Sequence, residues 1–125
     1  MLKVLSDSRG SLGSIEFADL PFVPRRFYWV MMVKNEIRGR HAHRNLEQIV
    51  FVQSGTIKFH LINGHTEAVR VLHEGEYLHL GNLIWREFEC VGENAILGCL
   101  ASQPYSEDDY IRDFEVYLET FNEIL

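Results

Sequence analysis

Short apolar or alternating segments, separated by turn residues, recur along most of this 125-residue chain. In the clearest example, Ile57, Phe59 and Leu61 alternate with polar residues, which predicts a strand with one buried face. Asn63-Gly64 follows, a pair typical of a tight hairpin turn, and Glu67–Leu72 is the expected partner strand. Many short strands with closely spaced turns are typical of a β-sandwich or a small barrel.

The rest of the chain extends this pattern. Arg26–Val33 is nearly all apolar and is predicted to be a central strand that is buried on both faces. Ser106 precedes three acidic residues, which favours a helix from about Glu107 to Glu119. Further strands are expected at 14–17, 48–52, 77–80, 84–90 and 95–101, with turns at 7–13, 54–55, 73–76, 81–82 and 91–94.

These elements predict one all-β domain over residues 1–125. The expected fold is a small cupin or jelly-roll double-stranded β-barrel with a short C-terminal helix. The net charge of −6 disfavours a nucleic-acid-binding face. We expect no membrane segment, no signal peptide and a cytoplasmic location, in which Cys90 and Cys99 stay as buried thiols.

His41 and His43 share one face if they lie on a strand, because side chains two apart point the same way. The pair is followed by Gln48 and Gly55 at the spacing of a cupin metal motif, but that motif has a carboxylate where this chain has Gln48. The last histidine of the motif aligns with Arg86, a permanent cation. Two of four ligands are therefore replaced, and we predict no metal and no other cofactor.

A histidine pair without a metal suits proton transfer, since imidazole titrates near neutral pH. Arg38, Arg40, Gln48 and Arg86 are expected to converge on the same cavity. An apolar core does not tolerate so many polar groups unless they serve a ligand or one another. The competing interpretation is that the two histidines only satisfy hydrogen bonds inside the barrel.

Several motifs then give the chain a resemblance to a known family. They are Asp7-Ser8-Arg9-Gly10-Ser11-Leu12, Arg26-Phe27-Tyr28, Arg38-Gly39-Arg40-His41-Ala42-His43, Trp85-Arg86-Glu87, Leu100-Ala101-Ser102 and Asp109-Tyr110-Ile111-Arg112. In this order they resemble the dTDP-4-keto-6-deoxyglucose 3,4-ketoisomerases, which are WxcM-like cupins. The resemblance spans nearly the whole chain.

The resemblance implies a metal-free enzyme that converts a dTDP-linked 4-keto-6-deoxyhexose to its 3-keto isomer. It also implies a homodimer that exchanges an N-terminal strand. The product would supply 3-amino-3,6-dideoxy sugars for bacterial surface glycans such as lipopolysaccharide or S-layer glycans.

Moving a carbonyl by one carbon requires a base that removes one proton and delivers another. We assign this role to His41, with His43 orienting or sharing it, and expect Tyr28 to carry the proton between the two oxygens. Arg38 and Arg40 are expected to hold the diphosphate, because guanidinium pairs with phosphate oxygens. Trp85 either packs on the substrate or belongs to the core.

The remaining assignments stay open. Gln48, Arg9 and Arg86 are expected beside the hexose, and variation at the two arginine positions could decide which face of C4 receives the proton. The gluco or galacto configuration of the product is therefore undecided. One alternative is a 3,5-epimerase, which needs a His–Asp pair, although the sequence places no aspartate near His41. Another is a non-catalytic module that binds sugar nucleotides.

Overall fold

Two long strands, β5 (Gln48–Asn63) and β8 (Trp85–Ala101), run side by side through the whole body of the protein. The structure is a computed structural model that describes residues 1–124. Seven further strands, two short 3₁₀ turns and one helix complete it: β1 (Leu2–Asp7), β2 (Gly10–Ile15), β3 (Arg26–Val33), β4 (Arg38–His43), β6 (Thr66–Leu72), β7 (Tyr77–Leu80), β9 (Tyr110–Ile111), η1 (Phe17–Asp19), η2 (Glu107–Asp109) and α1 (Phe114–Ile124).

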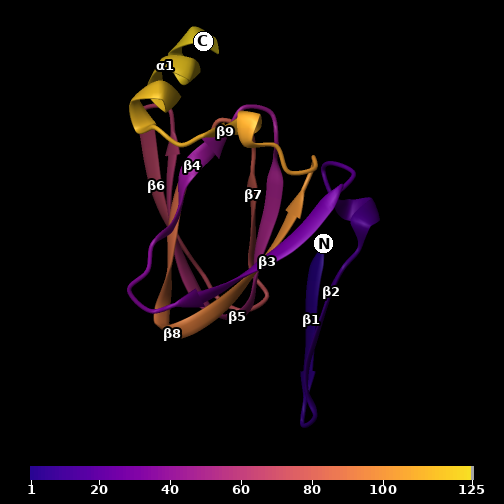
Figure 1. Cartoon of the computed structure of the whole chain (residues 1–125). Coiled ribbons are helices and arrows are strands. Elements are labelled where there is room, and N and C mark those ends of the chain that lie inside the picture. The colour runs from indigo at the N-terminus through magenta and orange to yellow at the C-terminus, as the bar shows by residue number, and fades with distance from the viewer. Residues whose placement is uncertain (125) are drawn as a thin grey trace.

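Both long strands bend near their middle, and each half belongs to a different layer (Figure 1). The first half of β5 pairs with β7 and with the second half of β8, which also pairs with β3. The second half of β5 pairs with β6 and with the first half of β8. That half of β8 also pairs with β4, and β4 pairs with β9. This gives the expected double-sheet β-barrel, whose sheets do not close into a ring within residues 1–124.

The prediction that the chain reverses direction at 54–55 and at 91–94 is wrong. These residues are the bends of β5 and β8, where the register shifts between Val52 and Thr56. Gly55 has a φ of +83°, and a Cβ there would lie 2.7 Å from the carbonyl oxygen of Asn94. Glycine thus lets the two strands cross closely while they bend.

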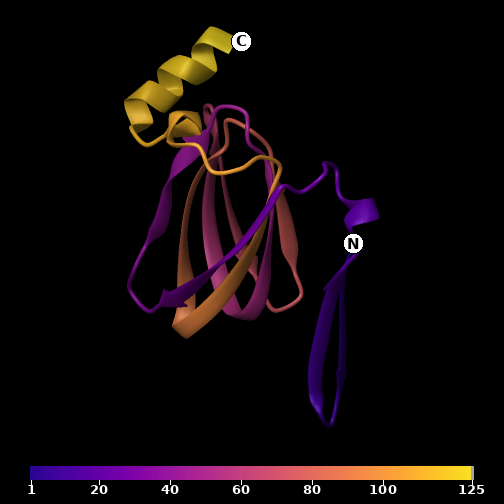
Figure 2. The same cartoon turned by 45° about the vertical axis from the view of Figure 1, so that its right-hand side comes forward.

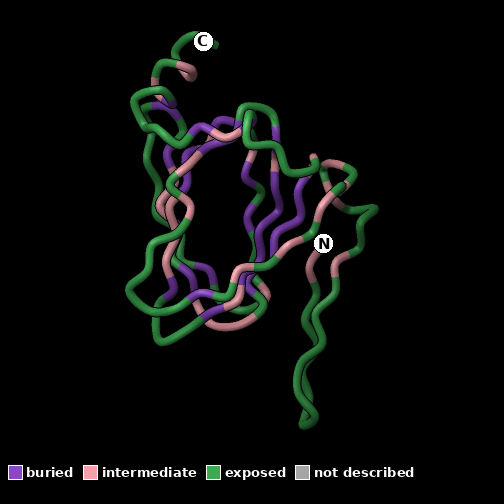
Figure 3. Tube along the Cα trace, viewed as in Figure 1, coloured by how far each residue is buried: buried purple, intermediate pink, exposed green. Residues whose placement is uncertain are grey.

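Apolar side chains of the two layers meet inside the barrel to form the main core, and Figure 3 shows the buried backbone concentrated there. Ile57 and Phe59 are fully buried in its centre, beside Leu97 and Met32. Cys90 and Cys99 are buried free thiols, as expected. Phe59 and Leu97 of this core also line the cavity described below.

The C-terminal helix begins later than predicted. Residues 107–109 form only one 3₁₀ turn, and residues 110–111 form β9, which pairs with β4. The helix begins at Phe114, where the carboxylate of Asp113 accepts the N–H of Val116 at 3.0 Å. The Tyr117 hydroxyl accepts the N–H of Gly64 at 2.8 Å and anchors the helix to the barrel. No helix in residues 1–124 is long and apolar enough to cross a membrane.

The N-terminal residues differ from the prediction too. In place of a turn at 7–13 and a strand at 14–17, they form the hairpin β1–β2, with Ser8 and Arg9 at its tip. Within residues 1–124 the two strands of this hairpin pair only with each other, and the hairpin extends away from the barrel (Figures 1 and 2). The strand β3 has the predicted bounds, but one of its faces is exposed rather than buried, because no layer covers it.

Candidate functional site

A cavity of about 220 Å³ opens between the two layers of the barrel. Its volume is below the range of roughly 300–1,000 Å³ that is typical of sites for whole drug-sized ligands, so it suits a sugar ring rather than a complete nucleotide. Its lining contains both polar and apolar side chains. The polar residues are Tyr28, Arg38, His41, Gln48, Arg86, Cys99, Tyr110 and Arg112.

A β-bulge in β4 decides which residues reach this cavity. Arg38 pairs with Phe88 and Gly39 with Glu87, but His41 pairs with Arg86, so Arg40 is the extra residue. Arg40 has a φ of +58° and lies outside the cavity wall. Because one residue is inserted, Arg38 and His41 both line the cavity although three positions separate them.

Gly39 makes this bulge possible. Its φ is +85°, and a Cβ would lie 2.8 Å from the carbonyl oxygen of Arg86. We expect Gly39→Ala to lower the free energy of unfolding by about 1–3 kcal/mol, since it forces a strained backbone against a neighbouring strand. Urea denaturation would measure this. Gly13→Ala is the control, because its Cβ would meet nothing closer than 3.9 Å; an equal loss in both variants would contradict the prediction.

Three polar side chains form one hydrogen-bonded chain along the cavity. The guanidinium of Arg86 donates from Nη1 to Oε1 of Gln48 at 2.6 Å, and Nε2 of Gln48 donates to the Tyr28 hydroxyl at 2.6 Å. The remaining Arg86 donors bond to the carbonyl oxygen of Ile84. Since the Tyr28 oxygen already accepts a hydrogen bond, its own proton is free to be donated elsewhere, including to a ligand.

The two histidines lie side by side with perpendicular rings, whose centroids are 4.9 Å apart. His41 lines the cavity, whereas His43 lies behind it and is fully buried. Asp109 accepts a hydrogen bond from His43 Nδ1 at 3.0 Å. The ring of Tyr110 packs against both histidines, at 4.9 Å from His41 and 4.5 Å from His43.

Burial keeps the histidines neutral and the tyrosine protonated. Desolvation, followed by the positive charge of Arg86, lowers the pKa of His41 to about 4 and that of His43 to about 3. Desolvation also raises the pKa of Tyr28 well above its ordinary value, and lowers that of Arg86 to about 10. At neutral pH the site therefore holds an uncharged base, a hydroxyl donor and one buried cation.

The lowered histidine pKa values predict a loss of stability in acid. Between about pH 6.5 and pH 4 the unfolded chain binds protons on these histidines that the folded chain does not, so the free energy of unfolding falls as the pH falls. Urea denaturation at pH 7.5 and 4.5 would measure the loss. The variant His41→Asn should lose about 2 kcal/mol less than the unchanged protein, and equal losses would contradict the assignment.

The donor set does not fit a divalent metal ion. Gln48 and Arg86, which align with two ligands of cupin metal sites, are hydrogen-bonded to each other, and the guanidinium charge faces the histidines. A cation placed there would be repelled. Within residues 1–124 no three or more His, Cys, Asp and Glu side chains form a group that could hold a metal.

The structure brings together most of the predicted site residues. Tyr28, Arg38, His41, Gln48 and Arg86 line one cavity, and the ring of His43 packs against that of His41 without lining the cavity. These predicted site residues come from four strands, β3, β4, β5 and β8, which place them around one cavity.

Three predicted residues lie elsewhere in this chain. Arg9 is at the tip of the N-terminal hairpin, paired with Asp7 at 2.7 Å. Arg40 is displaced by the bulge, with Nε 3.9 Å from Glu87. Trp85 is buried against Tyr117 of the helix, with its Nε1 donating to Glu87, which is the position that the core alternative predicts.

Sequence reasoning missed three site residues near the C-terminus. Asp109 bonds to His43, Tyr110 lines the cavity, and Arg112 lies over the Tyr110 ring at 4.2 Å from its centroid. The Arg112 guanidinium also pairs with Glu107 at 2.6 Å. The signal was available, since these residues lie in the conspicuous Asp-Tyr-Ile-Arg run, but only the pairing of β9 with β4 shows where that run goes.

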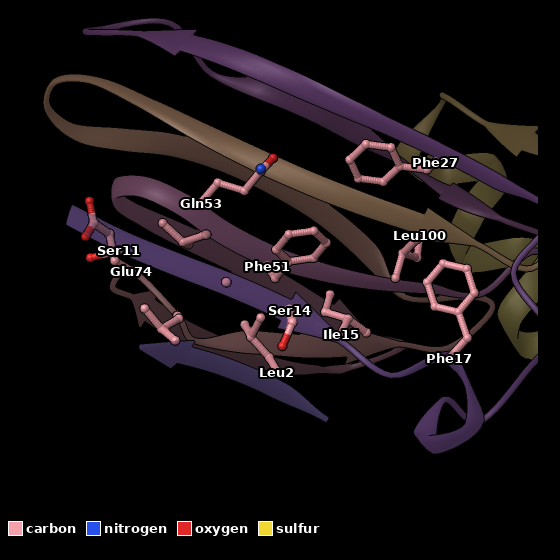
Figure 4. A pocket seen from close by; sticks show the side chains of 14 residues that line it. Leu2, Ser11, Ser14, Ile15, Phe17, Phe27, Phe51, Gln53, Glu74 and Leu100 are labelled. Atoms are coloured by element: carbon pink, nitrogen blue, oxygen red, sulfur yellow. The ribbon is translucent and has the colours of Figure 1, made fainter. Parts of the chain in front are cut away.

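A larger cavity of about 460 Å³ lies outside the barrel, between the hairpin β1–β2 and the barrel strands β5 and β8. Figure 4 shows Leu2, Ser14 and Ile15 of the hairpin on one side of it and Phe51 and Leu100 of the barrel on the other. Apart from Glu74, it is lined by apolar and uncharged polar side chains, none of them a histidine. Its chemistry therefore differs from that of the histidine cavity.

Comparison with known proteins shows the family to which the chain belongs. Residues 1–122 match the family described as FdtA: WxcM-like, C-terminal. A curated relative is the TDP-4-oxo-6-deoxy-alpha-D-glucose-3,4-oxoisomerase of Aneurinibacillus thermoaerophilus, 34% identical over 116 residues, which are 90% of this chain and 84% of the relative.

Solved structures give the same result. The sugar 3,4-ketoisomerase QdtA of Thermoanaerobacterium thermosaccharolyticum, in complex with TDP, superposes with a TM-score of 0.90 at 33% identity, covering 99% of this chain and 93% of that one. A 3,4-ketoisomerase from Helicobacter canadensis has a TM-score of 0.88 at 33% identity, covering 97% and 93%. The fold is thus that of cupin-like ketoisomerases, and the chain belongs to the FdtA family of WxcM-like, C-terminal domains.

Proposed function

We propose that this protein is a sugar-nucleotide 3,4-ketoisomerase that converts dTDP-4-keto-6-deoxyglucose to a dTDP-3-keto-6-deoxyhexose. The observation that carries the proposal is the cavity that an uncharged His41 and a protonated Tyr28 both line. The relatives support the substrate, since one is named for the TDP-4-oxo sugar and another was solved with TDP.

The reaction needs one base and one hydroxyl relay. His41 takes the C3 proton, the electrons of that C–H bond form the C3–C4 double bond, and the C4 carbonyl becomes an enediolate. Tyr28 transfers a proton from the C3 oxygen to the C4 oxygen, and His41 then returns its proton to C4. The buried Arg86 charge, fixed beside the cavity, stabilises the negative charge that develops.

Two arginines at the cavity suit the diphosphate. Arg38 and Arg112 both line it, and each guanidinium can pair with phosphate oxygens. Arg112 would have to exchange its pairing with Glu107 for the phosphate. We therefore assign the diphosphate to Arg38 and Arg112 in place of Arg40.

One NMR experiment tests the activity. The purified protein is incubated with dTDP-4-keto-6-deoxyglucose in deuterium oxide, and the sugar is followed by proton NMR. We expect the carbonyl to migrate to C3, with deuterium at C4 to the extent that the proton on His41 exchanges with solvent before it is returned. The coupling constant of the C4 proton in ordinary water gives the gluco or galacto configuration. Binding with neither migration of the carbonyl nor exchange at any carbon would overturn the proposal and favour a non-catalytic module.

The same experiment separates the ketoisomerase from a 3,5-epimerase. The epimerase hypothesis was disfavoured because no aspartate was expected near the histidines, yet Asp109 does pair with one of them, His43. Exchange at C3 and C5 without migration of the carbonyl would therefore support an epimerase. The family match and the named relatives favour migration.

We further propose that the protein acts as a homodimer whose N-terminal strands exchange between subunits. The outer face of β3 is apolar and exposed: Trp29 is 60% and Met31 70% exposed. The hairpin also exposes Leu5 and Leu12 and leaves the large cavity of Figure 4 beside the barrel. A second copy would cover these apolar surfaces.

Light scattering tests the dimer. We expect a mass of twice 14.6 kDa for the unchanged protein and a shift toward 14.6 kDa for Trp29→Glu, which places a charge on the apolar face. A monomer at micromolar concentration in the unchanged protein would contradict the proposal.

As a dimer in the cytoplasm, the enzyme would supply a 3-keto sugar to an aminating enzyme, because a ketone is what transamination consumes.

A further inference from the structure

An ion pair occupies one of the cationic side chains that line the cavity. Arg112 donates from Nε to Oε1 of Glu107 at 2.6 Å and from Nη2 to Oε2 at 3.1 Å. Two parallel hydrogen bonds of this kind make a bidentate pair, which is also the geometry in which a guanidinium binds phosphate. Glu107 therefore takes up donors of Arg112 that a phosphate group of a ligand would use.

Two tyrosines hold the partners of this pair. The Tyr105 hydroxyl donates to Oε2 of Glu107, and the Arg112 guanidinium lies over the ring of Tyr110, at 4.2 Å from its centroid. The centroids of the Tyr105 and Tyr110 rings are 5.6 Å apart. Because Tyr105 remains as a donor, the carboxylate of Glu107 keeps a partner when Arg112 bonds to a phosphate instead.

Glu107 is negatively charged at neutral pH. The hydrogen bonds from Arg112 and then from Tyr105 lower the pKa of its carboxyl to about 2. Both members of the pair are about half exposed, so a ligand can reach them from solvent. After burial and Arg86, the same pair also acts on the pKa of His41, with Arg112 lowering it and Glu107 raising it. The pair is therefore close to the proposed base.

We propose that Glu107 is an internal competitor of the diphosphate, which pairs with Arg112 when no ligand is bound and is displaced when a sugar nucleotide enters. The inference rests on the proposed function, which assigns Arg112 to the diphosphate. The charge of Glu107 opposes binding twice, because it occupies donors of Arg112 and because it repels an anionic ligand. Glu107 thus sets the affinity of the site and takes no part in the proton transfer.

The competition has a use in turnover. Substrate and product carry the same dTDP group, so a contact between Arg112 and the diphosphate stabilises both equally and does not lower the barrier of the reaction. A tighter contact would only retain the product, and product release limits the rate of many enzymes. Glu107 weakens this contact without changing the interactions at the sugar ring, where the chemistry takes place.

Calorimetry with dTDP tests the competition without any turnover. In Glu107→Gln the side chain keeps its size and loses its charge. We expect the dissociation constant of dTDP to fall about three- to fivefold, and thymidine, which has no phosphate, to show no such gain. Asp108→Asn is the matched control, because it removes one negative charge at an exposed neighbouring position, and it should leave dTDP binding nearly unchanged.

Steady-state kinetics give a second measurement. KM should fall in Glu107→Gln and kcat should not rise, because uniform binding lowers KM alone. A rise in kcat would show that Glu107 acts on the chemical step and would overturn the inference. The melting temperature of each variant establishes that it folds.

Three results of the calorimetry would also overturn the inference. Unchanged dTDP affinity in Glu107→Gln would mean that the pair does not compete with the ligand. Weaker binding would mean that Glu107 orients Arg112 for the phosphate. An equal gain in Asp108→Asn would mean that only net charge matters. Tighter dTDP binding in a protein that does not isomerise the sugar would support the competition and refute the proposed function, so the two are separable.

Discussion

Replacing His41 by asparagine is expected to abolish isomerisation while the protein keeps its affinity for the sugar nucleotide. His41 is the neutral imidazole that lines the cavity, and an amide of similar size cannot accept a proton at this pH. General-base catalysis contributes about 10²–10⁴-fold, so kcat should fall by that factor. Calorimetry with dTDP should show an almost unchanged dissociation constant.

The matched control is His65→Asn, in the exposed turn between β5 and β6, where the ring bonds only to Asn122. That variant should keep full activity. A His41→Asn variant that still moves the carbonyl, or that exchanges the C3 proton with deuterium at the normal rate, would show that the base is another residue. Loss of dTDP binding in His41→Asn would indicate that the substitution disrupts the site as a whole.

The strands of this fold could be located from the sequence because alternation and turn residues are local signals. The bounds of β3 and β7 are as predicted, and the second half of β5 alternates as expected. What could not be predicted was whether Gly55 and Gly92 reverse the chain or only bend it. Both have a positive φ, and a bend differs from a hairpin only through contacts with distant strands.

The helix shows the same limit. Acidic residues after Ser106 favoured a helix start there. Residues 107–109 form only a 3₁₀ turn, because Tyr110 and Ile111 pair with β4 instead of continuing a helix. The exposed face of β3 was misjudged for another reason: a nearly all-apolar strand predicts burial on both faces, but one face of β3 has no layer of this chain over it.

Site residues that lie close together in one segment could be predicted from the sequence. Site residues that meet only when distant segments pack together could not. His41 and Gln48 were found because their spacing is that of a cupin motif. Asp109 was not assigned a role, because its bond to His43 spans 66 positions in the chain. Arg40 was misplaced because a bulge inverts the alternation on which face assignments depend. Trp85 had to stay open between core and ligand site, because a buried tryptophan has the same local sequence in both.

Replacing Arg86 by methionine is expected to raise the pKa of both histidines and to slow the reaction. Arg86 is fully buried, and its charge is the second-largest cause of the lowered pKa values of His41 and His43. Methionine has a similar length without the charge, so the histidines should titrate closer to their ordinary pKa. Loss of the donor to Gln48 also frees Tyr28 from its fixed position.

The size of the effect follows from the contacts that are lost. Gln48 and the Ile84 carbonyl each lose a buried hydrogen bond, and an unsatisfied buried polar group costs about 1–3 kcal/mol, so the melting temperature should fall. Removing one preorganised charge or donor from a site lowers kcat by about 10²–10³-fold. NMR titration of the two imidazoles, thermal unfolding and steady-state kinetics would measure the three effects separately.

Arg70→Met is the matched control, because Arg70 is exposed on β6 and shares no element with the cavity. It should leave the histidine pKa values, the melting temperature and kcat nearly unchanged. If Arg86→Met slowed the reaction but left both imidazoles titrating where they do in the unchanged protein, the charge of Arg86 would not be what keeps them neutral. Its effect would then come only from positioning Gln48 and Tyr28, and burial alone would account for a base that is uncharged at neutral pH.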